Sequence, residues 1–179
     1  MVSELTGPLL KEVSRSFYLS LAVLPASLRP PVGLAYLLAR AADTVADTRA
    51  IEHEGRVRHL QALGAAIRMP ASDGIADVVA AVLPGQAAPA ERRLLERLPD
   101  VLAAYRALDD ADRARVATLL TTIIEGMTQD LRVFPGEDAD KLEALPARED
   151  LERYTYLVAG CVGEFWTDVH VAHRPRLRQ

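Results

Sequence analysis

Apolar residues recur along this chain at intervals of three and four, the spacing that gathers them on one face of an α-helix. Alternation with a period of two, which is typical of β-strands, is nearly absent. We therefore expect an all-α fold, a bundle of mostly antiparallel helices in a single domain over residues 1–179. The pattern predicts a brief helix that ends near Leu24 and short helices over residues 5–13 and 74–83. Longer helices are predicted over residues 31–48, 52–68, 90–107, 110–132 and 149–173.

Composition narrows the class of protein. Half of the residues are apolar and only 5% are aromatic, which is typical of helical bundles with aliphatic cores. The net charge of −4 gives no electrostatic support for a nucleic-acid partner. Because Cys161 is the one cysteine, no intrachain disulfide can form, and a cytoplasmic location is expected. We expect neither a signal peptide nor a membrane-spanning helix, although contact with a membrane surface stays open.

A polar stripe runs along the otherwise apolar segment 31–48. Steps of four, three and four residues separate Tyr36, Arg40, Asp43 and Asp47, so these side chains share one helical face. Two carboxylates one turn apart repel each other and lose hydration on burial, which is unfavourable unless a cation compensates. Magnesium is the natural cation, because it binds carboxylates together with substrate phosphates. A solvated or ion-paired face is the alternative, and the spacing alone does not decide between them.

The same spacing occurs a second time, at Asp73 and Asp77. This copy lies in a short stretch that contains glycine and is typical of a helix N-terminus, where acidic residues are ordinary. With 13 aspartates in the chain, one such pair arises by chance. The first pair differs because its surroundings are apolar and because an arginine, Arg40, lies on the same helical face.

Two further clusters combine polar residues with glycine inside predicted helices. Glycine is unfavourable in a helix by about 1 kcal/mol relative to alanine, so close approach of another helix or of a ligand is expected. In the last helix, Tyr154, Val158, Cys161 and Val162 share a face, either as a phenol above an apolar wall or as tight helix packing. The middle cluster, residues 125–130, either lines a cavity or faces solvent. No zinc-type histidine set, phosphate-binding glycine loop or serine-hydrolase elbow is present in the sequence.

Taken in order, these clusters resemble the squalene/phytoene synthase family, which joins two prenyl diphosphates head to head. The likeness rests on Val13-Ser-Arg-Ser-Phe17, on the segment Tyr36 to Asp47, on Glu125-Gly-Met127 with Asp130, and on Tyr154 to Gly163. It implies an isoprenoid-synthase-like fold and the condensation of two farnesyl diphosphates to presqualene diphosphate or squalene, or of two geranylgeranyl diphosphates to phytoene. Whether NADPH then acts as a reductant stays open.

The resemblance also assigns roles to individual residues. Asp43 and Asp47 would bind Mg²⁺ ions that bridge to the diphosphate, and Tyr154 would lie beside the reacting carbons. Phosphate oxygens would be held by basic and hydroxyl groups, namely Arg40, Ser14 and Arg15. The prenyl channel and other substrate contacts would come from Phe17, Tyr36, Gln129, Val158, Val162 and Gly163.

One departure from the family pattern matters for function. The family carries a second acidic motif about one helix beyond the Tyr154 block, and this sequence ends at Gln179 without it. We therefore expect an N-terminal portion of the family domain, completed by a C-terminal half or by a partner chain. The alternative is a non-catalytic helical subunit that binds a prenyl diphosphate or a partner. Peripheral membrane contact would serve a lipid product.

Overall fold

The computed structural model describes residues 2–14, 16–69, 74–134 and 143–178. Helices make up all the regular structure of these segments, and no β-strand occurs in them. The all-α fold expected from the sequence is confirmed. The elements are α1 (Val2–Glu4), η1 (Leu5–Leu9), α2 (Leu10–Ser14), α3 (Phe17–Ala22), α4 (Arg29–Ala46), α5 (His53–Arg68), α6 (Ile75–Val82), η2 (Leu83–Gly85), α7 (Pro89–Glu96), α8 (Leu98–Arg106), α9 (Asp110–Val133), α10 (Arg148–Thr155), η3 (Tyr156–Gly160), α11 (Cys161–His173) and η4 (Pro175–Arg178).

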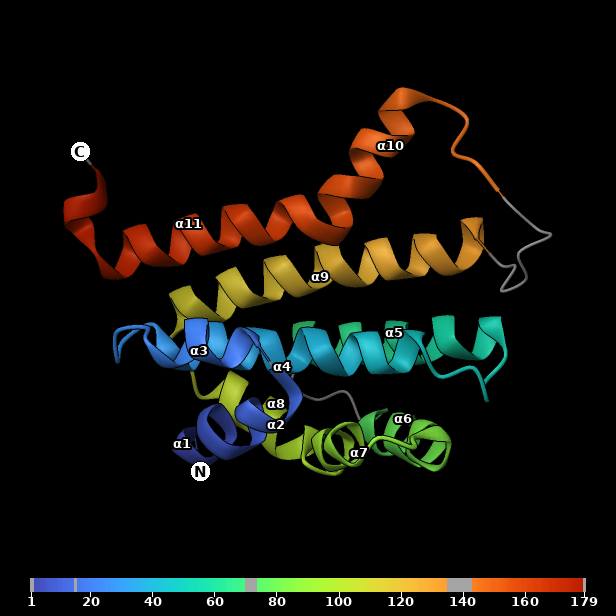
Figure 1. The fold of residues 1–179 in the computed structure, drawn as a ribbon, viewed down its shortest axis with the longest axis horizontal. Coiled ribbons are helices and arrows are strands. Elements are labelled where there is room, and N and C mark those ends of the chain that lie inside the picture. The colour runs from blue at the N-terminus through green and yellow to red at the C-terminus, as the bar shows by residue number, and fades with distance from the viewer. Residues whose placement is uncertain (1, 15, 70–73, 135–142, 179) are drawn as a thin grey trace.

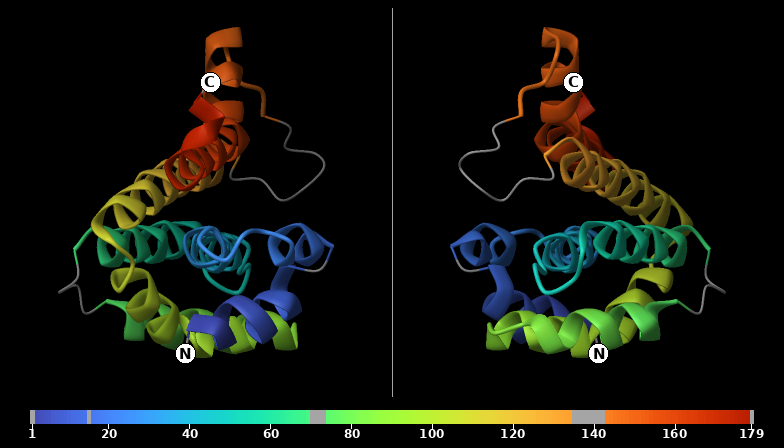
Figure 2. Two further views of the ribbon diagram at one scale, coloured as in Figure 1. Left: turned by 90° about the vertical axis from the view of Figure 1, so that its left-hand side faces the viewer. Right: turned by 90° about the vertical axis from the view of Figure 1, so that its right-hand side faces the viewer.

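The helices lie in layers around α4 (Figure 1). Helices α4 and α5 lie side by side in the middle, with α3 at the end of this layer (Figure 2). Helix α9 crosses above them and carries α11 on its far side, whereas α1, α2 and α6 to α8 lie below. Helix α4 therefore contacts α5, α7, α8 and α9, and the polar stripe that it carries lies among several elements.

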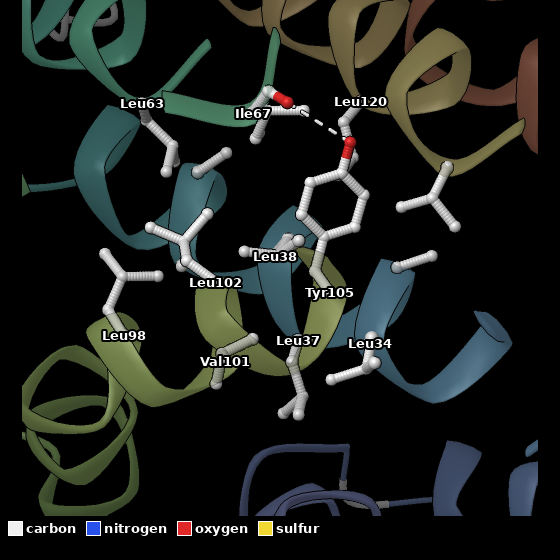
Figure 3. Packing of buried hydrophobic residues seen from close by; sticks show 14 of the residues in the cluster. Leu34, Leu37, Leu38, Leu63, Ile67, Leu98, Val101, Leu102, Tyr105 and Leu120 are labelled. Atoms are coloured by element: carbon white, nitrogen blue, oxygen red, sulfur yellow. Dashed lines mark hydrogen bonds between the residues drawn. The ribbon is translucent and has the colours of Figure 1, made fainter. Parts of the chain in front are cut away.

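The core beneath α4 is aliphatic, apart from one tyrosine (Figure 3). Tyr105 of α8 is 1% exposed and is the largest fully buried side chain. Its ring lies within this cluster of buried side chains, and its hydroxyl donates a 3.2 Å hydrogen bond to the carbonyl of Ile67 at the end of α5 (Figure 3). A buried phenol needs such a partner, because an unpaired polar group in an apolar core is costly.

The prediction of one helix over residues 90–107 is wrong, because the segment divides at Arg97 into α7 and α8. Pro99 explains the break: a proline lacks the N–H that would continue the helical hydrogen bonds, but it is tolerated in a first turn. The Nε of Arg97 also donates to Asp100 at 2.6 Å, which ties the junction to the new helix.

The last predicted helix, 149–173, has the right limits but not a uniform geometry. Between α10 and α11 the chain forms the wider turn η3, whose hydrogen bonds span five residues instead of four. An extra residue in one turn rotates everything beyond it, so the face expected from Tyr154, Val158, Cys161 and Val162 is split. Cys161 is 5% exposed against α9, whereas Val158 and Val162 are 40% and 42% exposed.

No helix in the described segments is both long enough and apolar enough to cross a bilayer. Asp73 of the second aspartate pair lies outside those segments. Asp77 of that pair is exposed on α6.

Candidate functional site

The polar stripe of α4 lies along the margin of the core. Tyr36, Arg40 and Asp43 are half-buried, whereas the residues around them on α4 are mostly fully buried. Asp47 caps the C-terminus of the helix and is exposed, with its N–H bonded to the carbonyl of Asp43 at 2.9 Å. The first three side chains therefore border an apolar interior, and the fourth reaches solvent.

Arg40 joins two acidic side chains from different helices. Its Nη1 donates to Asp43 of the same helix, and its Nη2 donates to Glu91 of α7 at 2.5 Å. Burial alone would lower the pKa of Arg40, but attraction to Asp43 and Glu91 outweighs it and the pKa is raised. Arg40 therefore stays charged and links α4 to α7.

Asp43 is an unusual carboxylate in this setting. Burial raises its pKa above the ordinary value of an aspartate, and repulsion from Asp47 adds to the rise, against the opposing attraction of Arg40. A neighbouring divalent cation would reverse both effects. Burial and the neighbouring Asp47 therefore disfavour the charged form of Asp43, and a bound cation would favour it.

Asp43 opens into a small cavity of about 260 Å³ that has both polar and apolar walls. Helix α4 supplies the polar side, and Ile123 and Met127 of α9 with Val158 of η3 supply the apolar side. The full lining is Tyr36, Ala39, Arg40, Asp43, Ile123, Met127 and Val158. An arginine and a carboxylate from α4, with aliphatic groups from α9 and η3 across from them, suit a ligand that has both a charged and an apolar part.

Asp47 faces a second and more polar cavity, of about 430 Å³. Asp130 and Phe134 from the end of α9 line it opposite His53 of α5. Asp43 and Asp47 therefore border different cavities, which lie against successive turns of α4.

Tyr154 is held at the end of α9. Its hydroxyl donates a 2.7 Å hydrogen bond to Oδ1 of Asp130, and its ring meets that of Phe134 edge to face, with centroids 5.9 Å apart. The hydrogen bond to Asp130 raises the pKa of Tyr154 to about 12, with burial and the carboxylate charge adding to it. Tyr154 is half-buried and contacts polar groups, so it is not the core residue that the packing alternative required.

The middle block brings α9 close to η3. Gly126 is buried, and a Cβ built on it would lie 3.0 Å from the Leu157 Cβ and 3.2 Å from the Leu157 carbonyl carbon. Close helix contact therefore explains this glycine. Glu125 points outward instead and pairs with Arg153 of α10.

The residues of the N-terminal block, Val13 to Phe17, do not all lie near the stripe. Phe17 is 61% exposed and stacks on Tyr36, with ring centroids 6.3 Å apart, so it lies next to the stripe. Ser14 is 3% exposed, and its hydroxyl donates to the carbonyl of Leu10 at 2.5 Å, which turns it inward. Arg15 lies outside the described residues.

Like Ser14 and Phe17, three further expected substrate contacts line neither cavity. Val162 and Gly163 are exposed on α11, and nothing lies within 4 Å of a Cβ built on Gly163. Gln129 lines a different hollow of about 460 Å³ between α5 and α9, which Arg68 and Arg132 also border. The structure therefore does not bring these three residues to the stripe.

The residues of the stripe fit a magnesium ion that is bound together with a substrate phosphate. Within the described segments, no three histidine, cysteine, aspartate or glutamate side chains are grouped closely enough to hold a metal by themselves. Asp43 and Asp47 offer two carboxylates one turn apart, and Mg²⁺ commonly takes one or two carboxylates and completes its shell with water and substrate phosphates. The donor set therefore suits a cation that arrives with a diphosphate.

Sequence reasoning missed Glu91. It lies 51 residues beyond Arg40 in a surface-type helix start, Pro-Ala-Glu, where acids are ordinary. No local pattern connects it to the stripe, and only the fold brings the two residues together. Covariation among homologous sequences is the kind of signal that would have revealed the pair.

Known proteins share the sequence pattern and the fold of this chain. The family model of squalene/phytoene synthase matches residues 10–179. A bifunctional lycopene cyclase/phytoene synthase from Sporisorium reilianum is 28% identical over 173 residues, which are 89% of this chain and 24% of that protein. A solved structure of the squalene synthase TcSQS in complex with the ligand E5700 superposes with a TM-score of 0.73 at 25% identity.

That superposition covers 96% of this chain and 45% of the squalene synthase chain, so the sequence spans less than half the length of either relative. The matched region contains the α4 stripe, the Gly126 block and the Tyr154 block in the order expected. The chain belongs to the squalene/phytoene synthase family.

Proposed function

We propose that this chain forms the wall of an active site that binds a prenyl diphosphate through Mg²⁺, in a protein that condenses two such molecules head to head. The observation that carries the proposal is the cavity shared by Arg40, Asp43 and Val158, which combines charged groups of α4 with apolar groups of α9 and η3. The presence of these residues in a chain of the squalene/phytoene synthase family supports it. The whole reaction is proposed for a protein of the length of its relatives.

In the reaction, the C–O bond of an allylic diphosphate breaks and both electrons leave on the diphosphate. The double bond of the second substrate then attacks the allylic carbon, and loss of one proton closes a cyclopropane ring. Magnesium, when bound, supplies the positive charge that stabilises the departing diphosphate. Asp43 and Asp47 would hold it, and Arg40 would donate to the phosphate oxygens.

The apolar wall has its own task. Ile123 and Val158 carry only hydrocarbon groups, and Met127 adds further apolar surface, so this wall would limit capture of the cation by water. Phe17, stacked on Tyr36, extends this wall along α4. Farnesyl diphosphate is the substrate proposed first, with geranylgeranyl diphosphate as the longer alternative.

Tyr154 is proposed as the group that takes the proton. It is protonated at neutral pH because its pKa is about 12, so it does not act as a phenolate. Its oxygen can accept a proton while its own proton passes to Asp130, which already receives the 2.7 Å hydrogen bond. The pair can thus remove one proton without a free phenolate in the site.

The test is release of diphosphate from farnesyl diphosphate in the presence of Mg²⁺, measured with the full natural protein. We expect Asp43→Asn to abolish release and Asp77→Asn, the matched change in the exposed second pair, to leave it unchanged. Equal turnover in Asp43→Asn and wild type would remove Asp43 from the mechanism. Mg²⁺-dependent binding of a non-hydrolysable farnesyl analogue without turnover would identify a binding subunit instead.

A further inference from the structure

We infer that Glu91 of α7 is a positioning residue, which holds the guanidinium of Arg40 at the mouth of the Asp43 cavity so that it meets a diphosphate in a fixed orientation. The identity of the ligand, a diphosphate, rests on the proposed function. The structural part of the inference, that Glu91 orders Arg40, stands on contacts within the chain.

Glu91 is itself firmly placed. It lies in the first turn of α7, one turn before Leu94 and Leu95, which are both fully buried, so its side chain lies on the side of α7 that meets the core. The start of the helix is fixed by Arg92, whose Nη1 donates to the carbonyl of Leu83 at 3.1 Å. The side chain of Glu91 is 21% exposed, so its bond to Arg40 is partly shielded from water.

Arg40 has a reason to need such a partner. An arginine side chain has many rotamers, and fixing it on a ligand is unfavourable in entropy. Nη1 is bonded to Asp43 and Nη2 to Glu91, so each end of the guanidinium is assigned to one carboxylate. If Asp43 held a metal ion, its bond to Nη1 would be lost, and Glu91 would keep the guanidinium in place with Nη1 available to a phosphate oxygen.

The negative charge of Glu91 would weaken diphosphate binding, whereas its positioning of Arg40 would strengthen it. A third carboxylate beside Asp43 and Asp47 repels a diphosphate, and it also raises the pKa of Asp43. If Glu91 acted only through its charge, its neutralisation would strengthen diphosphate binding. If it acts by orienting Arg40, neutralisation weakens binding. The sign of the change therefore decides between the two roles.

The first arm of the test needs no ligand. The Nε of Arg40 is buried, so its N–H signal in nitrogen-15 NMR, assigned by its loss in Arg40→Lys, reports the order of the side chain. We expect a rigid signal in wild type and a mobile one in Glu91→Gln. Glu12→Gln is the matched control, because it removes a 2.6 Å ion pair from Arg93 of the same helix without touching the stripe.

The second arm is a calorimetric titration with inorganic diphosphate and Mg²⁺. We expect the Kd to rise about tenfold in Glu91→Gln, as for the loss of one well-oriented charged hydrogen bond, and to stay unchanged in Glu12→Gln. Glu91→Asp should resemble Glu91→Gln, because its charge is kept but its shorter side chain no longer reaches Arg40.

The remaining outcomes separate this inference from the proposed function. Tighter binding in Glu91→Gln, or an unchanged Kd with an unchanged Arg40 signal, would overturn the positioning role and leave Glu91 as a tie between α7 and α4. No binding by the wild-type protein would overturn the proposed function and the ligand part of the inference. The Arg40 signal would even then decide whether Glu91 orders that side chain.

Discussion

The hydroxyl of Tyr154 donates a 2.7 Å hydrogen bond to Oδ1 of Asp130, which joins α10 to the end of α9. The edge-to-face contact with Phe134 fixes the ring from another side. Because an ionised phenol could not donate this bond and would face the carboxylate charge, the pKa of Tyr154 is raised to about 12. The proposed proton-transfer group is therefore held protonated by its own neighbour.

Replacing Asp130 by Asn should lower the pKa of Tyr154 from about 12 towards the ordinary tyrosine value of about 10. The amide removes both the charge-assisted hydrogen bond and the repulsion of a phenolate. A spectrophotometric titration of tyrosinate would measure the change, and subtraction of Tyr154→Phe would isolate one of the five tyrosines.

Glu164→Gln is the control, because Glu164 accepts a hydrogen bond from Tyr156 and raises the pKa of that residue instead. An unchanged Tyr154 titration in Asp130→Asn would show that burial, and not the carboxylate, sets its pKa.

Sequence periodicity predicted the fold well, because each long helix carries a continuous apolar stripe. The limits of α5 and α9 agree with the prediction to within one residue. The break at Arg97 was missed because the leucines on either side keep helical spacing across it, although Pro99 marks the new start. The turn η3 was missed because one inserted residue leaves no local signature in Tyr156–Gly160.

The candidate site was predictable only where its residues share one helix. Tyr36, Arg40 and Asp43 follow from helical geometry, and the structure keeps them on one face. Glu91 and the pairing of Tyr154 with Asp130 depend on contacts between helices, which spacing within one helix does not specify. Ser14 lies in a block that resembles the family, yet its hydroxyl donates to the backbone of its own helix. Membership of such a block therefore does not place a residue at the stripe.

Asp47→Asn should lower the pKa of Asp43. Burial raises that pKa first and repulsion from Asp47 second, so removing the second charge reverses part of the shift. Carbon-13 NMR of the Asp43 carboxyl group in the metal-free protein would measure it, with Asp77→Asn as the control that leaves it unchanged.

The same raised pKa makes Mg²⁺-dependent diphosphate binding sensitive to acid. A protonated carboxyl group binds Mg²⁺ poorly, so affinity should fall on acidification at a higher pH than the ordinary aspartate value of about 3.9 would give. Calorimetry across acidic pH would measure this loss. An affinity that stays constant down to the ordinary aspartate range would contradict a role for Asp43 in holding the metal.

Tyr105→Phe should reduce the free energy of unfolding by about 0.5–1.5 kcal/mol. The change deletes the hydroxyl that bonds to the Ile67 carbonyl and leaves that acceptor at the buried end of α5 (Figure 3). Chemical denaturation would measure the loss. Tyr18→Phe, at a half-buried position on α3, is the control and should change stability little; an equal effect of both would remove the buried hydrogen bond as the cause.

Gly126→Ala should destabilise the protein although alanine favours helices. The gain in helix propensity is about 1 kcal/mol. Against it, the new methyl group would lie 3.2 Å from the Leu157 carbonyl carbon, a backbone atom that cannot move aside as a flexible side chain can. Overpacking of this kind costs about 1–3 kcal/mol, so we expect a net loss of about 1 kcal/mol in chemical denaturation.

Gly163→Ala is the matched change with the opposite expectation. A methyl group at Gly163 meets nothing within 4 Å on the exposed side of α11, so only the gain in helix propensity remains, and stability should rise by up to about 1 kcal/mol. The difference between the two variants measures how closely α9 approaches η3, independently of any ligand. If both variants were stabilised, α9 and η3 would lie further apart than the Gly126 contacts require.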